Sequence, residues 1–161
     1  MIPVTDAQVR KAFINLTKGE AGRVNLPADL GAQPWDDLDY LGWRDPKAPQ
    51  RAYLVTEHGG ALRGVGLRLS QEVRGPRRTM CSLCLTVGEV SLMVANRAGR
   101  SGAAGNSVGT YICTDLACSL YLRGKRTVST PITHETLSIE QKVARLAANV
   151  DAFVARVLQP A

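Results

Sequence analysis

The chain has 161 residues, of which 45% are hydrophobic and 21% are charged, and its formal net charge is +6. This length and composition suit one compact domain with its own core and argue against a disordered chain. The sequence has no run of about 18 apolar residues that could cross a membrane. Its first residues lack the basic and apolar segments of a secretory signal, so we expect a cytoplasmic protein without a membrane partner.

The positive charge is concentrated in the middle of the chain. Residues 60–130 contain ten Lys or Arg against three Asp or Glu, whereas residues 1–59 contain seven against eight. Such a field attracts an anionic partner, for example RNA, a ribosomal surface or an acidic protein. The alternative is a basic surface that is simply solvated.

The N-terminal segment has the signals of a short helix. Thr5 to Gln8 has the form of a capping box, and the apolar residues that follow recur at helical spacing as far as Leu16. We expect this helix to run to about Lys18, because Gly19 then interrupts the pattern.

Residues 26–43 mix turn residues with apolar ones and predict an irregular segment. We expect four apolar side chains to hold this segment on the core, namely Trp35, Leu38, Leu41 and Trp43. The acidic residues Asp36, Asp37 and Asp39 resemble a metal or acid-base cluster, but such groups are more often a solvated face. The segment therefore predicts packing and no active site.

A β-hairpin follows this segment. Residues 51–58 and 61–69 alternate apolar and polar positions around Gly59-Gly60, a pair suited to the positive φ angles of a two-residue turn. Gly75-Pro76 then breaks the chain. We expect one domain over residues 1–161, with a subregion 1–75 and a second subregion 76–161.

Four cysteines occur in two pairs, Cys81 with Cys84 and Cys113 with Cys118. Two residues between thiolates let one tight turn supply two ligands, and structural zinc takes four tetrahedral ligands. A cytoplasmic chain keeps its thiols reduced, which favours zinc over the alternatives of two disulfides or of one disulfide and two buried thiols. The sequence predicts one structural zinc ion, although iron can also fill a four-thiolate site.

The segments around the cysteines predict a knuckle, a hairpin and a helix in that order, which is a treble clef. Residues 89–95 and 108–112 read as paired strands, and residues 116–122 begin a short helix that ends near Gly124. Residues 97–107 are so rich in glycine that we expect a mobile loop without one conformation.

The last helix has the strongest pattern in the chain. Ser138 to Gln141 is a second capping box, and an apolar stripe follows over five turns. The elements together predict an α+β fold in which a treble-clef zinc finger packs with an antiparallel hairpin or sheet, a short N-terminal helix and a long C-terminal helix.

No pattern in the sequence supports an enzyme or a small-molecule substrate. His58 and His134 lack the partner spacing of a catalytic zinc site, and the glycine-rich segments lack the Lys-Ser/Thr of a phosphate loop. One enzymatic alternative is a thiol redox centre at Cys81 and Cys84, which requires an exposed thiol of low pKa.

Several segments of the chain resemble one protein family. The segments CSLCLTVGEVSLMVANRAG, GNSVGTYICTDLACSLYLRGK and LDYLGWRDPKAPQRAYLV are similar to the C-terminal zinc domain of elongation factor G-binding proteins of the FusB/FusC type. The resemblance extends from about Phe13 to Phe153. It implies a treble clef that binds elongation factor G, promotes its release from the ribosome and gives protection against fusidic acid. The family's resistance proteins carry a helical bundle before this domain, where this sequence offers only one short helix, so factor binding is the firmer expectation.

The resemblance also implies a contact face around the helix after the second cysteine pair and near the end of the last helix. The matching positions are Tyr121, Arg123, Lys125, Arg126 and Phe153. Aromatic anchors flanked by basic residues are typical of interface hot spots. The alternatives are that Phe153 is a core residue of the helix stripe, that Tyr121 caps the zinc finger, and that the cations are solvated.

A second function remains open from the residues alone. A basic zinc module can bind RNA or the ribosome directly through phosphate contacts, and the candidate cations are Arg74, Arg77, Arg78, Arg97 and Arg100. Binding that weakens steeply with salt would favour this alternative.

Overall fold

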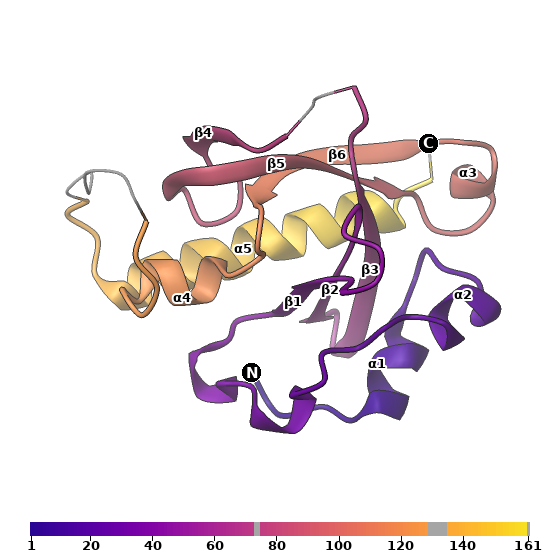
Figure 1. The fold of residues 1–161 in the computed structure, drawn as a ribbon, viewed down its shortest axis with the longest axis horizontal. Coiled ribbons are helices and arrows are strands. Elements are labelled where there is room, and N and C mark those ends of the chain that lie inside the picture. The colour runs from indigo at the N-terminus through magenta and orange to yellow at the C-terminus, as the bar shows by residue number, and fades with distance from the viewer. Residues whose placement is uncertain (73–74, 129–134, 161) are drawn as a thin grey trace.

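The computed structural model describes residues 1–72, 75–128 and 135–160. Within this part of the chain, six strands form one antiparallel sheet (Figure 1). The strands are β1 (Leu41–Arg44), β2 (Arg51–His58), β3 (Ala61–Leu69), β4 (Arg77–Met80), β5 (Val87–Asn96) and β6 (Ser107–Cys113). The main path runs β1-β2-β3-β5-β4, and β6 pairs with β5 along the edge opposite β3.

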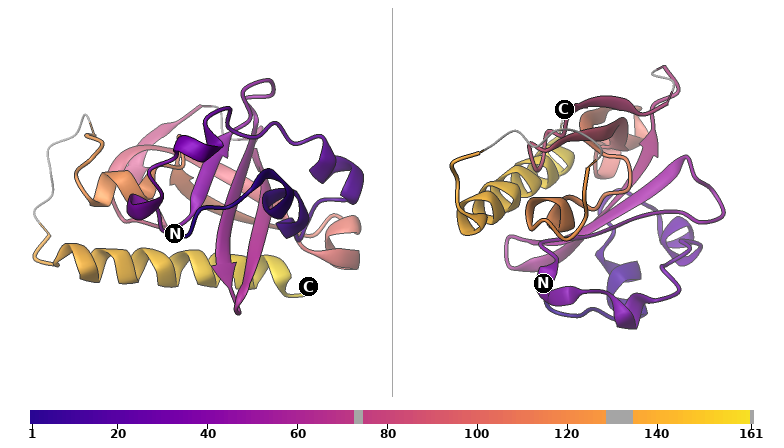
Figure 2. Two further views of the ribbon diagram at one scale, coloured as in Figure 1. Left: turned by 90° about the horizontal axis from the view of Figure 1, so that it is seen from below. Right: turned by 60° about the vertical axis from the view of Figure 1, so that its left-hand side comes forward.

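The helices lie on both faces of this sheet. The α-helices are α1 (Asp6–Ala12), α2 (Lys18–Gly22), α3 (Gly99–Ala103), α4 (Cys118–Leu122) and α5 (Ile139–Leu158), and the 3₁₀ helices are η1 (Leu30–Ala32) and η2 (Trp35–Asp37). The right-hand view of Figure 2 shows the β2–β3 hairpin between α5 and the N-terminal helices. The sheet is therefore the middle layer of three, and the mixed α+β fold is as predicted.

Strand β2 is buried on both faces because each face meets a different core. Ala52 and Leu54 belong to the core that contains α5 and the cysteines, whereas Tyr53 and Val55 belong to the core under the N-terminal segment. Side chains alternate between the two faces of a strand, so adjacent residues enter different cores. Trp35, Leu38, Leu41 and Trp43 all lie in the N-terminal core, as predicted.

The capping boxes and the hairpin turn are confirmed. The side chains of Thr5 and Ser138 accept hydrogen bonds at the starts of α1 and α5. Gly59 and Gly60 have φ angles of 60° and 75°, and the register pairs His58 with Ala61. Two consecutive positive φ angles match the twist of the flanking strands.

The predicted first helix is too long. Helix α1 ends at Ala12, because Phe13 is extended and forms an isolated bridge to Gly64 of β3. The amide of Ile14 donates to the Gly64 carbonyl at 2.9 Å. A new capping box at Thr17 then starts the separate helix α2. A strand contact has replaced the last turns of the expected helix.

Two further expectations about loops are corrected. The end of the segment expected to be irregular forms strand β1, which pairs with β2 over four residues. The expected mobile loop contains helix α3, whose turn closes on the carbonyls of Arg100 and Gly102. Arg97 ties this region to the end of α5 by donating to the carbonyls of Arg156 and Gln159. These contacts come from distant elements and give no local sequence signal.

Candidate metal centre

The four cysteines are brought together by two loops and a helix start. Cys81 and Cys84 lie in the turn between β4 and β5, whereas Cys113 ends β6 and Cys118 begins α4. In the first turn, the Cys81 amide donates to the Thr86 carbonyl at 2.9 Å and the Leu85 amide donates to the Cys81 carbonyl at 3.0 Å. Figure 1 shows this knuckle at the end of the β5–β6 ribbon, close to α4.

The sulfur atoms have the spacing that one tetrahedral zinc requires. All four lie within 4.8 Å of one another, and the Cys81–Cys118 and Cys84–Cys113 Sγ distances are 3.7 and 3.6 Å. A Zn–S bond of about 2.3 Å in a tetrahedron gives S···S distances of about 3.8 Å. A disulfide bond would be about 2.05 Å long. The residues present therefore fit one structural zinc ion.

The knuckle backbone supports the thiolate state of its first cysteine. The amides of Leu83 and Cys84 point at the Cys81 sulfur, at 3.4 and 3.5 Å. Hydrogen bonds from Cys113 and then Cys118 also lower the pKa of Cys81. The hydrogen bond with Cys113, followed by that with Cys81, raises the pKa of Cys118. Four buried sulfurs cannot all be anionic without a cation among them, so metal binding must displace protons.

Tyr40 lies next to this centre and gave no signal in the sequence. Its side chain is fully buried, and its hydroxyl has no hydrogen-bond partner within the described residues. Burial, followed by the proximity of Cys118, raises the pKa of Tyr40 well above its ordinary value. The phenol therefore stays neutral beside the sulfur cluster.

The burial of the cysteines bears on the redox alternative. Cys81 and Cys84 are 0% and 3% exposed, and the four sulfurs are not joined as disulfides. A redox thiol must meet its substrate in solution. The enclosed position therefore favours a structural metal centre over thiol exchange.

Four of the predicted contact residues lie in or just after α4, and each contacts an acidic side chain of the same chain. Arg123 forms two hydrogen bonds to the carboxylate of Asp39, at 2.7 and 3.0 Å, and its side chain is 15% exposed. Lys125 pairs with Asp37 at 2.9 Å. The acidic segment before β1 thus neutralises part of the basic one.

Tyr121 and Arg126 share one acceptor, because both contact the carboxylate of Asp115, at 2.7 and 2.9 Å. Burial, followed by this hydrogen bond, raises the pKa of Tyr121 above its ordinary value. Phe153 is 2% exposed and lies in the core under α5. Phe153 therefore presents no surface to a partner unless the core opens. Its position agrees with the alternative given above, in which Phe153 is a core residue of the helix stripe.

The cations proposed for RNA contact do not form one patch. Arg77 and Arg78 lie on β4, which pairs with the first half of β5, whereas Arg97 and Arg100 follow the other end of β5. At about 3.3 Å per residue, the eight steps along the strand from Glu89 to Arg97 separate the two pairs by roughly 25 Å. Arg74 and His134 lie outside the described residues.

His58 is placed by α5. Its Nδ1 lies 2.5 Å from the carboxylate of Asp151, and its side chain is 18% exposed. This contact links the hairpin tip to the helix and involves no cysteine. The structure gives His58 a role in packing.

Residue patterns alone did not reveal two features of the fold. Met80, directly before the first cysteine, is 52% exposed, and every residue of its strand β4 is exposed. Asp45 is a buried carboxylate whose oxygens accept from Asn25, the Tyr53 hydroxyl and the amides of Lys47 and Ala48. No local sequence pattern predicts that Met80 is exposed. The Asp-Pro pair at 45–46, in contrast, is a turn signal that could have drawn attention to Asp45.

Comparison with known proteins agrees with this geometry. A family model described as the FBP C-terminal treble-clef zinc-finger matches residues 8–157. Among solved structures, the fusidic acid resistance protein FusC is similar, with a TM-score of 0.56 and 21% sequence identity. That similarity covers 74% of this chain and 52% of the FusC chain, so the match spans about half of FusC. A search of the curated proteins finds no match. No helix of the described residues is long and apolar enough to cross a membrane. Because the family model covers nearly the whole chain and its four cysteines meet in one cluster, this protein belongs to the FBP C-terminal treble-clef zinc-finger family.

Proposed function

We propose that this protein binds elongation factor G through its zinc finger and does not act as an enzyme. The observation that carries the proposal is the treble clef itself, with its four-sulfur centre, in a chain that matches the zinc-finger family over residues 8–157. The similarity to FusC and the sequence resemblance to elongation factor G-binding proteins support this partner. The zinc ion then supports binding indirectly, because it holds in place the loops that carry the binding face.

The surface that suits a protein partner best is the outer side of β4. Its residues Arg77 to Met80 are all exposed, and β4 is the terminal strand of the main path through the sheet. Met80 offers a flexible apolar side chain next to arginine residues, which is the composition of an interface anchor. The contacts of Arg123, Lys125 and Arg126 with acidic residues make those three cations less available.

Binding would change the behaviour of the factor only through a difference in affinity. If the protein binds the conformation of elongation factor G that is free of the ribosome more tightly than the bound conformation, it shifts the factor toward release. The same difference would oppose a drug that holds the factor on the ribosome, which gives a route to fusidic acid protection.

The direct test is calorimetric titration of the zinc-loaded, RNase-treated protein with purified elongation factor G. We expect one-to-one binding, and we expect Met80→Asp to weaken it by about ten-fold or more, because a charge replaces the apolar anchor. Ile2→Asp is the matched control, since Ile2 is also exposed but lies at the N-terminus, away from β4. Absence of binding by the parent protein would refute the proposal.

A second arm separates the two candidate partners. Binding of a ribosomal RNA fragment that falls by orders of magnitude between low and physiological salt, without factor binding, would favour the nucleic-acid alternative. A third arm adds fusidic acid to a translocation assay. Faster release of the factor in the presence of the protein would support the release mechanism, and an unchanged rate would limit the function to binding.

A further inference from the structure

A buried tyrosine hydroxyl lies beside the metal centre without a hydrogen-bond partner. Tyr40 is 2% exposed and belongs to the same core as the four cysteines. No atom of the described residues accepts a hydrogen bond from its hydroxyl. Burying a hydroxyl without a partner costs free energy, so such groups are rare in folded proteins. An acceptor for this hydroxyl should therefore lie close by.

The backbone places Tyr40 opposite Cys118. Three contacts join residues 39–44 to residues 114–119 in antiparallel order, namely the Asp39 amide with the Ser119 hydroxyl at 3.0 Å, Gly42 with Leu116, and the Arg44 guanidinium with the Thr114 carbonyl at 3.5 Å. Each step forward along the first segment corresponds to one step back along the second. The same register sets Tyr40 opposite Cys118, the last of the four metal ligands.

A glycine lets the tyrosine ring approach the loop that carries these ligands. A Cβ at Gly42 would lie 2.7 Å from an atom of the Tyr40 ring and 2.7 Å from the Leu116 side chain. The ring and the loop thus close over the same bare Cα. Leu41 lies on the other face of β1 and enters the N-terminal core instead. The alternation of this strand therefore directs Tyr40 toward the sulfurs.

Cys118 lacks the donors that Cys81 receives. The amides of Leu83 and Cys84 point at the Cys81 sulfur, whereas no amide of the described residues donates to the Cys118 sulfur. After burial, Cys118 is the group that most raises the pKa of Tyr40. A zinc-bound cysteine is a thiolate, which accepts a hydrogen bond more strongly than a thiol does. A donor without an acceptor and a thiolate without a donor are thus neighbours.

We propose that Tyr40 is a positioning residue of the zinc centre, and that its hydroxyl donates a hydrogen bond to the Cys118 thiolate in the zinc-loaded protein. The bond draws negative charge away from one of the four thiolates and fixes the orientation of the Cys118 side chain. Loss of such a partner of a metal ligand typically costs about 10–100-fold in metal affinity. The proposal concerns the metal centre, so it does not depend on the binding of elongation factor G.

The test uses Co²⁺ in place of zinc, because the sulfur-to-cobalt charge-transfer band reports the electron density on the thiolates. Tyr40→Phe removes the hydroxyl and keeps the ring. Without the hydrogen bond the sulfur electrons lie at higher energy, so the band should move to longer wavelength. In chelator competition at a single pH, the variant should also bind zinc about ten-fold more weakly or worse.

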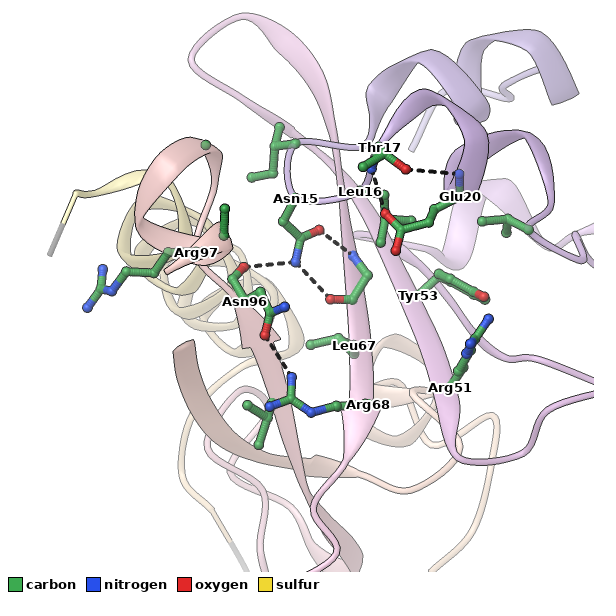
Figure 3. Close-up of a pocket in the computed structure, with 17 residues that line it drawn as sticks. Asn15, Leu16, Thr17, Glu20, Arg51, Tyr53, Leu67, Arg68, Asn96 and Arg97 are labelled. Atoms are coloured by element: carbon green, nitrogen blue, oxygen red, sulfur yellow. Dashed lines mark hydrogen bonds between the residues drawn. The ribbon is translucent and has the colours of Figure 1, made fainter. Parts of the chain in front are cut away.

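Tyr53→Phe is the matched control, because Tyr53 is a buried tyrosine in the other core. Its hydroxyl donates to Asp45 at 3.1 Å, and Figure 3 shows its side chain at a cavity that no cysteine lines. Tyr53→Phe should leave the charge-transfer band unchanged even if stability falls. Any change that it causes in zinc affinity measures the contribution of stability alone, and Tyr40→Phe should exceed that change.

The direction of the stability change distinguishes a bonded hydroxyl from an unbonded one. If the hydroxyl donates to the thiolate, Tyr40→Phe should lower the melting temperature of the zinc-loaded protein. If the hydroxyl has no partner, its removal relieves the cost of burying it, and the melting temperature should rise.

A measurement on the parent protein applies even if Tyr40→Phe does not fold. With ¹¹³Cd at the site, the Tyr40 hydroxyl proton should exchange slowly with water and show a scalar coupling to the metal across the hydrogen bond. The proposal is overturned by an unchanged charge-transfer band in Tyr40→Phe, by zinc binding no weaker than in Tyr53→Phe, by a higher melting temperature, or by a hydroxyl proton without coupling to ¹¹³Cd.

Discussion

At the scale of single residues, the four cysteine sulfurs bring together segments that lie far apart in the sequence. Each is buried, and together they hold the ends of β4, β6 and α4 at one point. Removing Cys84 deletes one thiolate from the tetrahedral set and leaves the other three with poor geometry.

We therefore expect Cys84→Ser to weaken zinc by more than about 100-fold, since loss of a direct ligand exceeds the effect of losing a neighbouring contact. Chelator competition followed by metal analysis measures this, with one zinc per chain expected for the parent protein. Ser82→Ala is the control, because Ser82 lies between the two ligands and is exposed. Equal zinc retention by the Cys84 and Ser82 variants would contradict the assignment.

Asp45 is the second residue with a defined energetic role. Burial raises its pKa, but the amide of Lys47, the Asn25 side chain, the Tyr53 hydroxyl and the amide of Ala48 lower it more, so the pKa lies below its usual value. The hydrogen bond between Asp45 and Tyr53 also affects the tyrosine. Burial, followed by this hydrogen bond, raises the pKa of Tyr53 to about 12. A carboxyl with a lowered folded pKa adds stability above its unfolded pKa and loses it as the pH falls through the folded value.

Asp45→Asn should destabilise the protein at pH 7 by about 1–3 kcal/mol, because the charged acceptor is lost from a buried network. The difference from the parent should shrink as the pH falls below about 4 and the parent carboxyl becomes protonated. Urea unfolding of both proteins across this range measures the difference directly and cancels the shared zinc contribution. A difference that does not change with pH would show that shape, not charge, matters at this position.

At the scale of elements, local sequence patterns correctly predicted where the helices and the hairpin begin. Where the first helix ends is decided by tertiary contacts. The capping boxes at Thr5 and Ser138 and the turn at Gly59-Gly60 are each settled by neighbouring residues. The end of α1 depends on Gly64, which lies about fifty positions further along the chain. Neither the helical spacing of the apolar residues nor the composition of the segment indicates that contact.

Helix α3 gives a sharp test of an element that composition did not predict. A Cβ at Gly102 would lie 1.8 Å from the Arg97 carbonyl oxygen, a backbone atom that cannot move without breaking the turn. Gly102→Ala should destabilise the protein by about 1–3 kcal/mol through this overpacking.

Gly22→Ala is the matched control for Gly102→Ala. Gly22 ends α2, and a Cβ added there would have nothing within 4 Å, so alanine should be neutral or stabilising by up to about 1 kcal/mol. Denaturant unfolding compares the two variants. A similar effect of both substitutions would mean that helix propensity, rather than the close approach to Arg97, sets the cost.

At the scale of the whole molecule, two ion pairs of the described residues join the acidic segment before β1 to the zinc finger, and the pair of Arg123 with Asp39 is the more buried. Arg123 and Asp39 are 84 positions apart, and their side chains are 15% and 10% exposed. The two hydrogen bonds form a bidentate pair, which is stronger than a single surface contact. The uneven charge seen along the sequence is thus partly balanced in the fold.

A double-mutant cycle of Arg123→Ala and Asp39→Ala should give a coupling energy of about 1–2 kcal/mol, allowing for the remaining solvent screening. The corresponding cycle for Lys125 and Asp37, with Lys125 56% exposed, should give about 0.2–1 kcal/mol. Unfolding free energies of the single and double variants provide both values. A larger coupling for the exposed pair would contradict this description of how the two halves are joined.

The sequence by itself determined the zinc ligands, the treble-clef order and the main helix and hairpin starts. Each of these depends on residues within one short segment, such as the two between Cys81 and Cys84. Only the tertiary structure decided that Phe153 is buried, that Arg123 is paired and that Met80 is exposed. Those properties depend on which distant segment packs against each side chain, and that choice is made when the two cores form on either side of the sheet.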